Sequence, residues 1–244
     1  MAEIVGSTKY MNTDYVEYQK QYRIDMRESD KLTIALIKDN LPAGEVVTLL
    51  DIGCHNGNLL YHLKKTLPAL RMTGGDLFEG LIDGCRADPD LSGIDFQVMD
   101  VTKLDCPPMD VIVASAVLFR FDDVQHRNVW ENIYRSLKPG GIAVTFDFYN
   151  SFHQTLRMVD ETETHPDGLI LTFRSQQSVR TQLSEIGFTY INFQMFEIPI
   201  DLELQDSTDP IHTHTRCSAD GKRLQFRGSL YQPWCHLVAR KPDA

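Results

Sequence analysis

The amino-acid sequence predicts a doubly wound α/β fold, in which helices cover both faces of a mostly parallel sheet. Between residues 46 and 148, short apolar segments alternate with segments whose apolar residues recur at helical spacing. The segment 109–117 is nearly all apolar, as expected of a parallel strand buried on both faces. A chain of 244 residues, 42% of them hydrophobic, is long enough to bury one such core.

The N-terminal part is expected to be helical. Apolar and tyrosine side chains recur at helical spacing between residues 14 and 40, and Leu41-Pro42-Ala43-Gly44 ends the pattern. We therefore divide the chain into an N-terminal helical lid, residues 1–44, and a core, residues 45–244.

The core is expected to contain seven strands. Five of them alternate with helices at 58–67, 78–86 and 122–137, and these strands are 46–51, 71–77, 94–101, 109–117 and 142–148. A helix at 178–186 precedes a strand-like run at 190–200 and a last strand within 224–240. Two polar stretches, 149–174 and 201–223, are expected to be insertions at the edge where the parallel strands end.

Composition argues against several classes of function. Twenty-four Lys and Arg against 34 Asp and Glu give a net charge of −10, and no basic run stands out, which disfavours a nucleic-acid partner. No apolar run is long enough for a membrane span and no signal peptide is recognised, so a cytoplasmic protein is expected. Five cysteines without a CxxC pair predict neither disulfides nor a metal site. His212, His214 and Cys217 match no zinc spacing.

A glycine-containing turn and two acidic residues are candidates for ligand binding. The segment 49–58 joins a strand to a helix, and its glycines let the backbone approach a ligand closely. Such a turn alone could serve a nucleotide, a flavin or no ligand. Asp76 and Asp100 end the second and third expected strands, where carboxylates could accept ribose hydroxyls and an adenine amino group.

With these features in order, the chain resembles the class I S-adenosylmethionine (SAM)-dependent methyltransferase family. The matching segments are VTLLDIGCHNG, TGGDLFEG, FQVMDVTKL, DVIVASAVLFRF and LKPGGIAVTFDF, within residues 45–150. The resemblance implies a Rossmann-like, seven-stranded sheet, SAM as the cofactor and an enzyme that transfers a methyl group. One departure is His55, which stands where the family usually has a small residue.

The resemblance also implies roles for residues at the strand ends. Asp51 and Gly53 would border the methionine part of SAM, and Asp76 would hold the ribose. The full set of expected cofactor contacts is Asp51, Gly53, Cys54, His55, Gly57, Asp76, Leu77, Asp100, Val101, Ser115 and Ala116. Arg23, in the expected lid, is a further candidate for pairing with the SAM carboxylate.

The acceptor side is less defined by the sequence. His153 follows the fifth strand and is a candidate general base, with Tyr149 beside it as a second candidate catalytic residue. Candidate acceptor-binding residues are Tyr18, Tyr22, Phe119, Arg120 and Trp234. For all of these, plain packing or a solvated surface position is the alternative.

These features together predict a SAM-dependent methyltransferase that acts on an N or O atom of a small-molecule acceptor, in a pathway such as natural-product biosynthesis. The expected oligomeric state is a monomer or a homodimer. One alternative is an RNA or protein methyltransferase, and another is a module that binds SAM without transferring the methyl group. An NAD-dependent dehydrogenase is disfavoured, because the G-x-G-x-x-G spacing is missing after the first strand.

Overall fold

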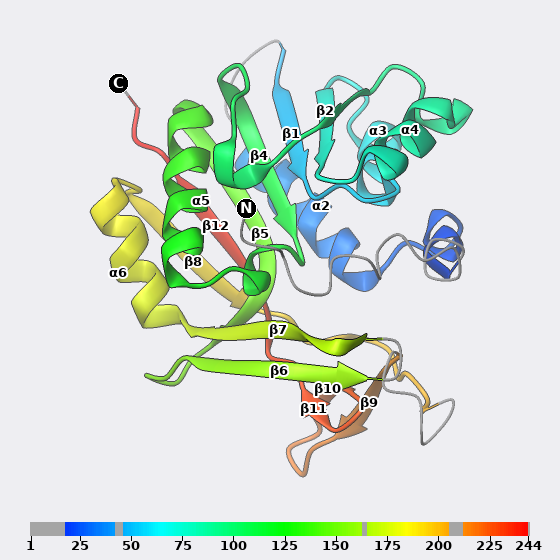
Figure 1. Ribbon diagram of the computed structural model, residues 1–244, viewed down its shortest axis with the longest axis vertical. Coiled ribbons are helices and arrows are strands. Elements are labelled where there is room, and N and C mark those ends of the chain that lie inside the picture. The colour runs from blue at the N-terminus through cyan, green and yellow to red at the C-terminus, as the bar shows by residue number, and fades with distance from the viewer. Residues whose placement is uncertain (1–17, 42–45, 163–164, 205–211, 244) are drawn as a thin grey trace.

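The central sheet has the mostly parallel, doubly wound topology that the sequence pattern predicts. The computed structural model describes residues 18–41, 46–162, 165–204 and 212–243. Among them, seven strands follow one another in the order β3-β2-β1-β4-β5-β12-β8 (Figure 1). These strands are β1 Thr48–Ile52, β2 Arg71–Asp76, β3 Asp95–Val98, β4 Met109–Ser115, β5 Leu137–Asn150, β8 Tyr190–Met195 and β12 Trp234–Arg240. β12 runs antiparallel to both neighbours, while β1 to β5 are parallel.

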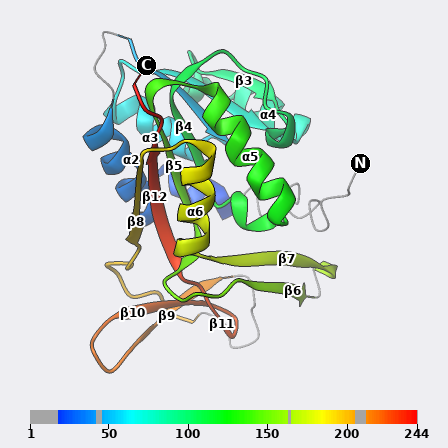
Figure 2. The ribbon, with the colours of Figure 1, turned by 90° about the vertical axis from the view of Figure 1, so that its left-hand side faces the viewer.

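Helices cover both faces of this sheet, which confirms the predicted layers. The helices are α2 Glu28–Asn40, α3 Asn58–Thr66, α4 Glu79–Ala87, α5 Asp123–Ser136 and α6 Gln176–Ile186. α2, α3 and α4 pack on one face and α5 and α6 on the other, so Figure 2 shows α2 and α6 on opposite sides of β12. Side chains of each strand alternate between the faces. In β1, for example, Leu49 joins the α2–α4 side and Leu50 the α5–α6 side.

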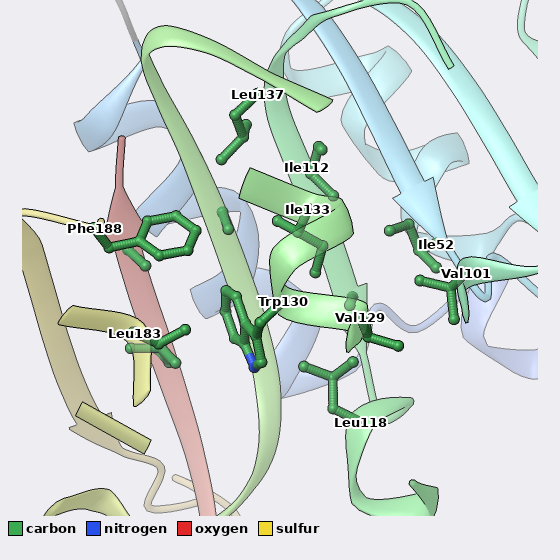
Figure 3. Close-up of a cluster of buried hydrophobic side chains, with 14 of the residues drawn as sticks. Ile52, Val101, Ile112, Leu118, Val129, Trp130, Ile133, Leu137, Leu183 and Phe188 are labelled. Carbon is green, nitrogen blue, oxygen red and sulfur yellow. The ribbon is translucent and has the colours of Figure 1, made fainter. Parts of the chain in front are cut away.

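The larger core lies beneath α5 and α6. Trp130 of α5 is completely buried and its ring meets Phe188 edge to face, with ring centroids 5.6 Å apart (Figure 3). Its indole N–H donates to His126 Nε2 at 3.2 Å. Asp122 begins α5 with a capping box, in which its carboxylate accepts the Gln125 backbone N–H and the Gln125 side chain accepts the Asp122 N–H.

The two predicted insertions form further strands beneath the main sheet (Figure 1). Residues 149–174 were expected to be a polar insertion, and much of this segment is an antiparallel hairpin of β6 Leu156–Thr162 and β7 His165–Ser175. The second insertion contains β9 Thr213–Cys217, β10 Arg223–Arg227 and β11 Leu230–Tyr231, which form a three-stranded sheet. We call the two insertions together the roof, residues 151–174 and 196–233.

Each insertion leaves the main sheet and returns to it at neighbouring positions. Asn150 at the end of β5 is paired with Ser175, which ends β7. Likewise Met195 at the end of β8 is paired with Cys235 of β12. The sheet register is therefore continuous on both sides of each insertion. None of the described helices is long and apolar enough to cross a membrane.

Candidate functional site

A cavity of about 1060 Å³ lies where β1, β2 and β4 end. This is the edge at which open α/β sheets bind ligands. Its walls come from three parts of the chain: the segment from Tyr18 to Lys31, the loops after the parallel strands, and residues of the roof and of β12. The volume is at the upper end of the range for small-molecule sites.

The turn after β1 lines the cavity and leaves backbone exposed to it at Gly53. Gly53 has φ +70°, and a Cβ there would lie 2.6 Å from Val117 Cγ2. The backbone N–H groups of Gly53 and Cys54 both donate to the Gly75 carbonyl, at 2.7 and 3.0 Å. His55 has φ +50°, so this residue takes the left-handed conformation that glycine adopts more easily. Although His55 replaces the small residue usual in the family, the turn keeps the backbone conformation that a glycine would adopt there.

Two carboxylates at the strand ends are held by backbone groups. Asp76 accepts the N–H of His55 at 2.9 Å on one oxygen and the N–H of Phe78 at 3.1 Å on the other. Asp100 accepts the N–H and the hydroxyl of Thr102 through a single oxygen. Because a carboxylate oxygen can accept more than one hydrogen bond, both groups retain capacity for a ligand in the cavity.

An acidic cluster lines the same end of the cavity. Asp30, Asp51 and Asp76 are all buried. Burial raises the pKa of Asp51 well above its usual value, and the charges of Asp30 and Asp76 raise it further. Burial also raises the pKa of Asp30, although Arg27, 3.5 Å away, opposes the shift. Carboxylates crowded in this way are stabilised by a positively charged ligand.

Asp30 is a site residue that the sequence analysis missed. Met26, Asp30 and Ile34 are spaced four residues apart, so the acid interrupts the apolar stripe of the N-terminal region. A carboxylate within an apolar helix face is rarely buried without a function or a partner. The acidic residue within this apolar stripe was the feature of the sequence that could have identified Asp30 as a site residue.

All but one of the cofactor candidates at the strand ends line the cavity. The residues Asp51, Gly53, Cys54, His55, Asp76, Leu77, Asp100, Val101, Ser115 and Ala116 all line the cavity. Gly57 does not line it. It precedes α3 with φ +72°, and a Cβ there would lie 2.8 Å from Leu91 Cδ1.

Arg23 is directed away from the cavity, contrary to its expected pairing with a ligand carboxylate. Its guanidinium donates to Asn58 Oδ1 and to the Asn56 carbonyl, both at 2.6 Å, and forms an ion pair with Asp88 at 3.1 Å. Arg23 therefore anchors the N-terminal segment to the start of α3. Arg27 lines the cavity instead, with its guanidinium 4.0 Å from the centroid of the Tyr22 ring.

Neither candidate catalytic residue lies at the cavity. Tyr149 is buried on the α5–α6 side of β5, where its hydroxyl is 3.2 Å from Thr145 Oγ1, and burial raises its pKa well above the usual range. The reason is the alternation of β5, because Phe146 and Phe148 face the cavity and Tyr149 faces the opposite side. His153 is exposed on the loop between β5 and β6 and does not line the cavity. The general-base role expected for His153 has no geometric support.

The five acceptor candidates, Tyr18, Tyr22, Phe119, Arg120 and Trp234, all line the cavity. Tyr22 lies beside Arg27, which pairs with Asp30 at the acidic end, whereas Phe119 and Trp234 are in ring contact with each other. The indole of Trp234 lies 4.5 Å from the Phe146 ring and 4.2 Å from the Phe148 ring, centroid to centroid. The sequence analysis missed other lining residues here, namely Phe146, Phe148, Phe196, Gln225 and Arg227. Their binding roles stay predictions.

Comparison with known proteins agrees with this geometry. Residues 49–141 match the family described as a methyltransferase domain. This segment is less than half of the chain, and it is similar to methyltransferase domains. The match agrees with the class I SAM-dependent methyltransferase family that the sequence motifs predicted. The matched residues include β1, β2, β3 and β4, whose ends form the acidic end of the cavity.

Individual relatives of this methyltransferase domain are distant. The ubiquinone/menaquinone biosynthesis C-methyltransferase UbiE of Desulfotalea psychrophila is 30% identical over 107 residues, 43% of this chain and 42% of that protein. The tRNA N(3)-methylcytidine methyltransferase Mettl2 of Drosophila melanogaster is 24% identical over 212 residues, 80% of this chain and 58% of that protein. The chain thus spans about half the length of the curated relatives it matches.

Solved structures confirm the fold. The 1,6-didemethyltoxoflavin-N1-methyltransferase of Burkholderia thailandensis superposes with a TM-score of 0.64, covering 97% of this chain and 89% of that one. The sequence identity is 15%, so this likeness shows a shared architecture alone.

The residues present fit SAM, the cofactor of this methyltransferase family. SAM carries an ammonium and a sulfonium, and the acidic cluster offers three buried carboxylates at one end of the cavity. Asp76 is oriented by two backbone N–H groups and keeps capacity to accept the hydroxyls of a ribose. At Gly53 the absence of a side chain leaves backbone at the cavity wall.

Proposed function

We propose that this protein transfers the methyl group of SAM to an N or O atom of a small-molecule acceptor. One observation carries the proposal: the acidic end of the cavity is continuous with an aromatic end beneath the roof. A cofactor and an acceptor could therefore share one continuous space. A volume of about 1060 Å³ is ample for both.

The chain's own residues would act mainly by binding and positioning. Asp76 and Asp100 would hold the ribose and adenine, while Asp30 and Asp51 would stabilise the positive charge of the cofactor. When bound, SAM supplies an electrophilic methyl group. The aromatic walls exclude water and fix the acceptor, and alignment of this kind is a large part of catalysis by methyltransferases.

The choice between an N and an O acceptor depends on how the acceptor becomes nucleophilic. Among the described lining residues, the histidine is His55, which lies at the cofactor end, and burial lowers its pKa. A neutral amine or an oxygen that is already ionised would need positioning more than a general base. This favours such acceptors over a neutral alcohol.

The proposal is tested by calorimetric titration with SAM and S-adenosylhomocysteine (SAH), followed by an assay of SAH formation. Both ligands should bind, and Asp76→Asn should weaken both by about tenfold, the effect of losing one charge-assisted hydrogen bond. The acceptor panel should contain small amines, phenols and carboxylates, with a tRNA preparation as the nucleic-acid arm.

The outcomes distinguish a small-molecule methyltransferase from an RNA methyltransferase and from a module that binds SAM without transferring its methyl group. SAH formation with a small molecule supports the proposal. Formation with tRNA alone, steeply weakened by salt, would support an RNA methyltransferase instead. Binding of SAM without product from any acceptor would favour the non-catalytic module, and failure of both ligands to bind would contradict the cofactor assignment.

A further inference from the structure

The segment 117–121, between β4 and α5, brings the aromatic ring of Phe119 into the cavity wall. It contains the short helix η5, Leu118–Arg120. Phe119 is 6% exposed and lines the cavity, and its ring centroid lies 4.9 Å from that of Phe148 and 6.2 Å from that of Trp234. A single helical turn is not stable by itself. The place of Phe119 in the wall must therefore be fixed by contacts with the rest of the chain.

One of these contacts is made by a buried carboxylate on β5. Asp147 is 1% exposed and does not line the cavity, whereas its neighbours Phe146 and Phe148 do. One oxygen of Asp147 accepts the backbone N–H of Phe119 at 3.0 Å, and the other accepts that of Phe148 at 2.7 Å. A carboxylate forms stronger hydrogen bonds with N–H groups than a neutral acceptor does. The backbones of two residues whose rings pack in the wall are thus bound to the same charged group.

The second contact is made by a guanidinium from the roof. Arg174 of β7 is 5% exposed and does not line the cavity. It donates to the Phe121 carbonyl at 2.6 Å and to the Leu118 carbonyl at 3.4 Å, and it pairs with Asp123 at 3.3 Å. Because the guanidinium is a planar group with several N–H donors, one side chain binds carbonyls at both ends of η5.

Asp147 and Arg174 lie on neighbouring strands, because β7 pairs with the end of β5. Arg174 is the backbone partner of Tyr149, two residues after Asp147. Burying charged side chains away from water is costly unless hydrogen bonds compensate the loss. Here much of that compensation comes from backbone groups of the segment 117–121. The segment is therefore bound through an N–H group to the main sheet and through two carbonyls to the roof.

We propose that Asp147 and Arg174 are positioning residues for the methyl acceptor: they fix the segment 117–121 from outside the cavity, and so set the place of the Phe119 ring in its wall. Neither residue lines the space in which the acceptor would bind. That the ligand beside Phe119 is a methyl acceptor rests on the proposed function. The fixing of Phe119 by Asp147 does not.

The charge of Asp147 makes this arrangement testable. Burial raises the pKa of Asp147 to about 7, although its hydrogen bonds and the charge of Arg174 oppose the shift. The other titratable groups that face Asp147 are Arg120 on η5, Tyr149 on the same strand and Cys235 on β12. Burial lowers the pKa of Arg120 to about 10, raises that of Cys235 to about 12 and raises that of Tyr149 well above its usual value. Because Arg174 also stays protonated, Asp147 is the member of this group that gains a proton as the pH falls through 7. Its bonds to the two N–H groups then weaken.

The direct test is nuclear magnetic resonance of the isotope-labelled, full-length protein between pH 6 and pH 8. We expect the backbone N–H resonances of Phe119 and Phe148 and the indole N–H resonance of Trp234 to move together, with a midpoint near pH 7. In Asp147→Asn one oxygen is replaced by an NH₂ group that cannot accept, so these resonances should be displaced already at pH 8 and should no longer follow the pH. The indole N–H of the buried Trp130 is the internal reference. Resonances that ignore the pH in the unaltered protein, or that Asp147→Asn leaves in place, would overturn the proposal.

Two further variants separate positioning from a general loss of stability. Asp110→Asn is the matched control, because Asp110 lies near the start of β4, accepts the Thr48 N–H at 2.8 Å, pairs with Lys138 at 2.6 Å and does not line the cavity. It should lower the free energy of unfolding and leave the Phe119 resonance in place. Arg174→Lys keeps the charge but lacks the planar fork, so it should displace the Phe119 resonance and preserve its pH dependence. Displacement by Asp110→Asn, or none by Arg174→Lys, would contradict the proposed roles.

Activity measurements connect the segment to the acceptor. With an acceptor that gives SAH in the assay above, Asp147→Asn should raise KM about tenfold at pH 8, while kcat changes less and SAH affinity is unchanged. KM of the unaltered protein should fall as the pH rises through 7, and KM of the variant should not. An unchanged KM in the variant would overturn the proposal. If no acceptor gives SAH, the proposed function is contradicted, and the resonance titration still decides whether Asp147 fixes Phe119.

Discussion

In the turn after β1, Gly53, His55 and Gly57 all have positive φ angles. Gly53 lacks room for a side chain, since a Cβ would lie 2.6 Å from Val117. Gly57 is confined by Leu91 in the same way. His55 tolerates the left-handed region at φ +50° and donates its backbone N–H to Asp76. The turn therefore depends more on Gly53 than on a glycine at position 55.

Gly53→Ala should disturb both stability and cofactor binding. The added methyl group meets Val117, and the left-handed conformation costs alanine about 1–2 kcal/mol. We expect lower free energy of unfolding in urea and weaker SAH binding. Gly84→Ala in α4 is the control, because nothing lies within 4 Å of a Cβ there and alanine stabilises helices by roughly 0.5–1 kcal/mol. A Gly53→Ala protein as stable as the control would contradict this account of the turn.

Asp51→Asn should separate stability from SAM binding. The pKa of Asp51 is raised chiefly by burial, so the stability of the folded state that this group supplies is present at low pH and falls as pH rises through that pKa. Removing the carboxylate should therefore not reduce the unfolding free energy at neutral pH. SAM affinity should fall about tenfold and lose the rise with pH that we expect of the unaltered protein as Asp51 ionises. A SAM titration over a series of pH values checks both, and identical pH profiles would contradict the role of Asp51.

At the scale of elements, strand alternation explains the main differences from the sequence analysis. The residues around Tyr149 predicted that a strand ends near the site. They did not predict which side chains of that strand face the cavity. In β7, Leu169, Leu171 and Phe173 occupy alternate positions and are buried, which is a strand pattern. The many polar residues around this run led to the expectation of a loop-like insertion.

α2 and β12 are joined by a buried histidine. His236 of β12 is completely buried, its Nε2 lies 3.0 Å from Thr33 Oγ1 of α2, and its ring packs against Phe146. Burial lowers the pKa of His236 to about 4. The two residues are 203 positions apart, so nothing in local sequence patterns could reveal the contact.

This histidine should make folding sensitive to acid. A lowered pKa means that the stability is fully present above the unfolded pKa of about 6.5 and is lost as pH falls toward 4, by up to about 3 kcal/mol. His126, whose pKa is also lowered by burial, acts in the same direction. The measurement is therefore the difference in urea unfolding between the unaltered protein and His236→Gln from pH 7.5 to 4.5. Parallel curves would argue against a role for His236.

At the scale of the whole molecule, the cavity is closed by segments that are far apart in the chain. Motifs within residues 45–150 were sufficient to predict the doubly wound fold, the family and most of the residues that line the cofactor end. The acceptor end could not be predicted as a set, because Arg120, Gln225 and Trp234 meet only through the roof and the long-range pairing of β12 with β5.

Ligand binding should accordingly protect several distant segments at once. With SAH bound, we expect slower amide hydrogen exchange at the start of α2 and in the turn after β1, because both contribute cavity walls. α6, which packs on the opposite face from α2, serves as the internal control (Figure 2). Equal protection of α6 would indicate general stabilisation and not local closure.

The paired ends of the two insertions bear on how this protein could change over generations. Asn150 adjoins Ser175, and Met195 adjoins Cys235, so each insertion spans almost no distance along the sheet. Lengthening, shortening or exchanging either one leaves the strands around it in register, and surface insertions are well tolerated energetically. The two insertions could therefore be exchanged by recombination while the cofactor-binding part of the chain stays the same. The same two junctions are suitable points for grafting a roof from a related enzyme.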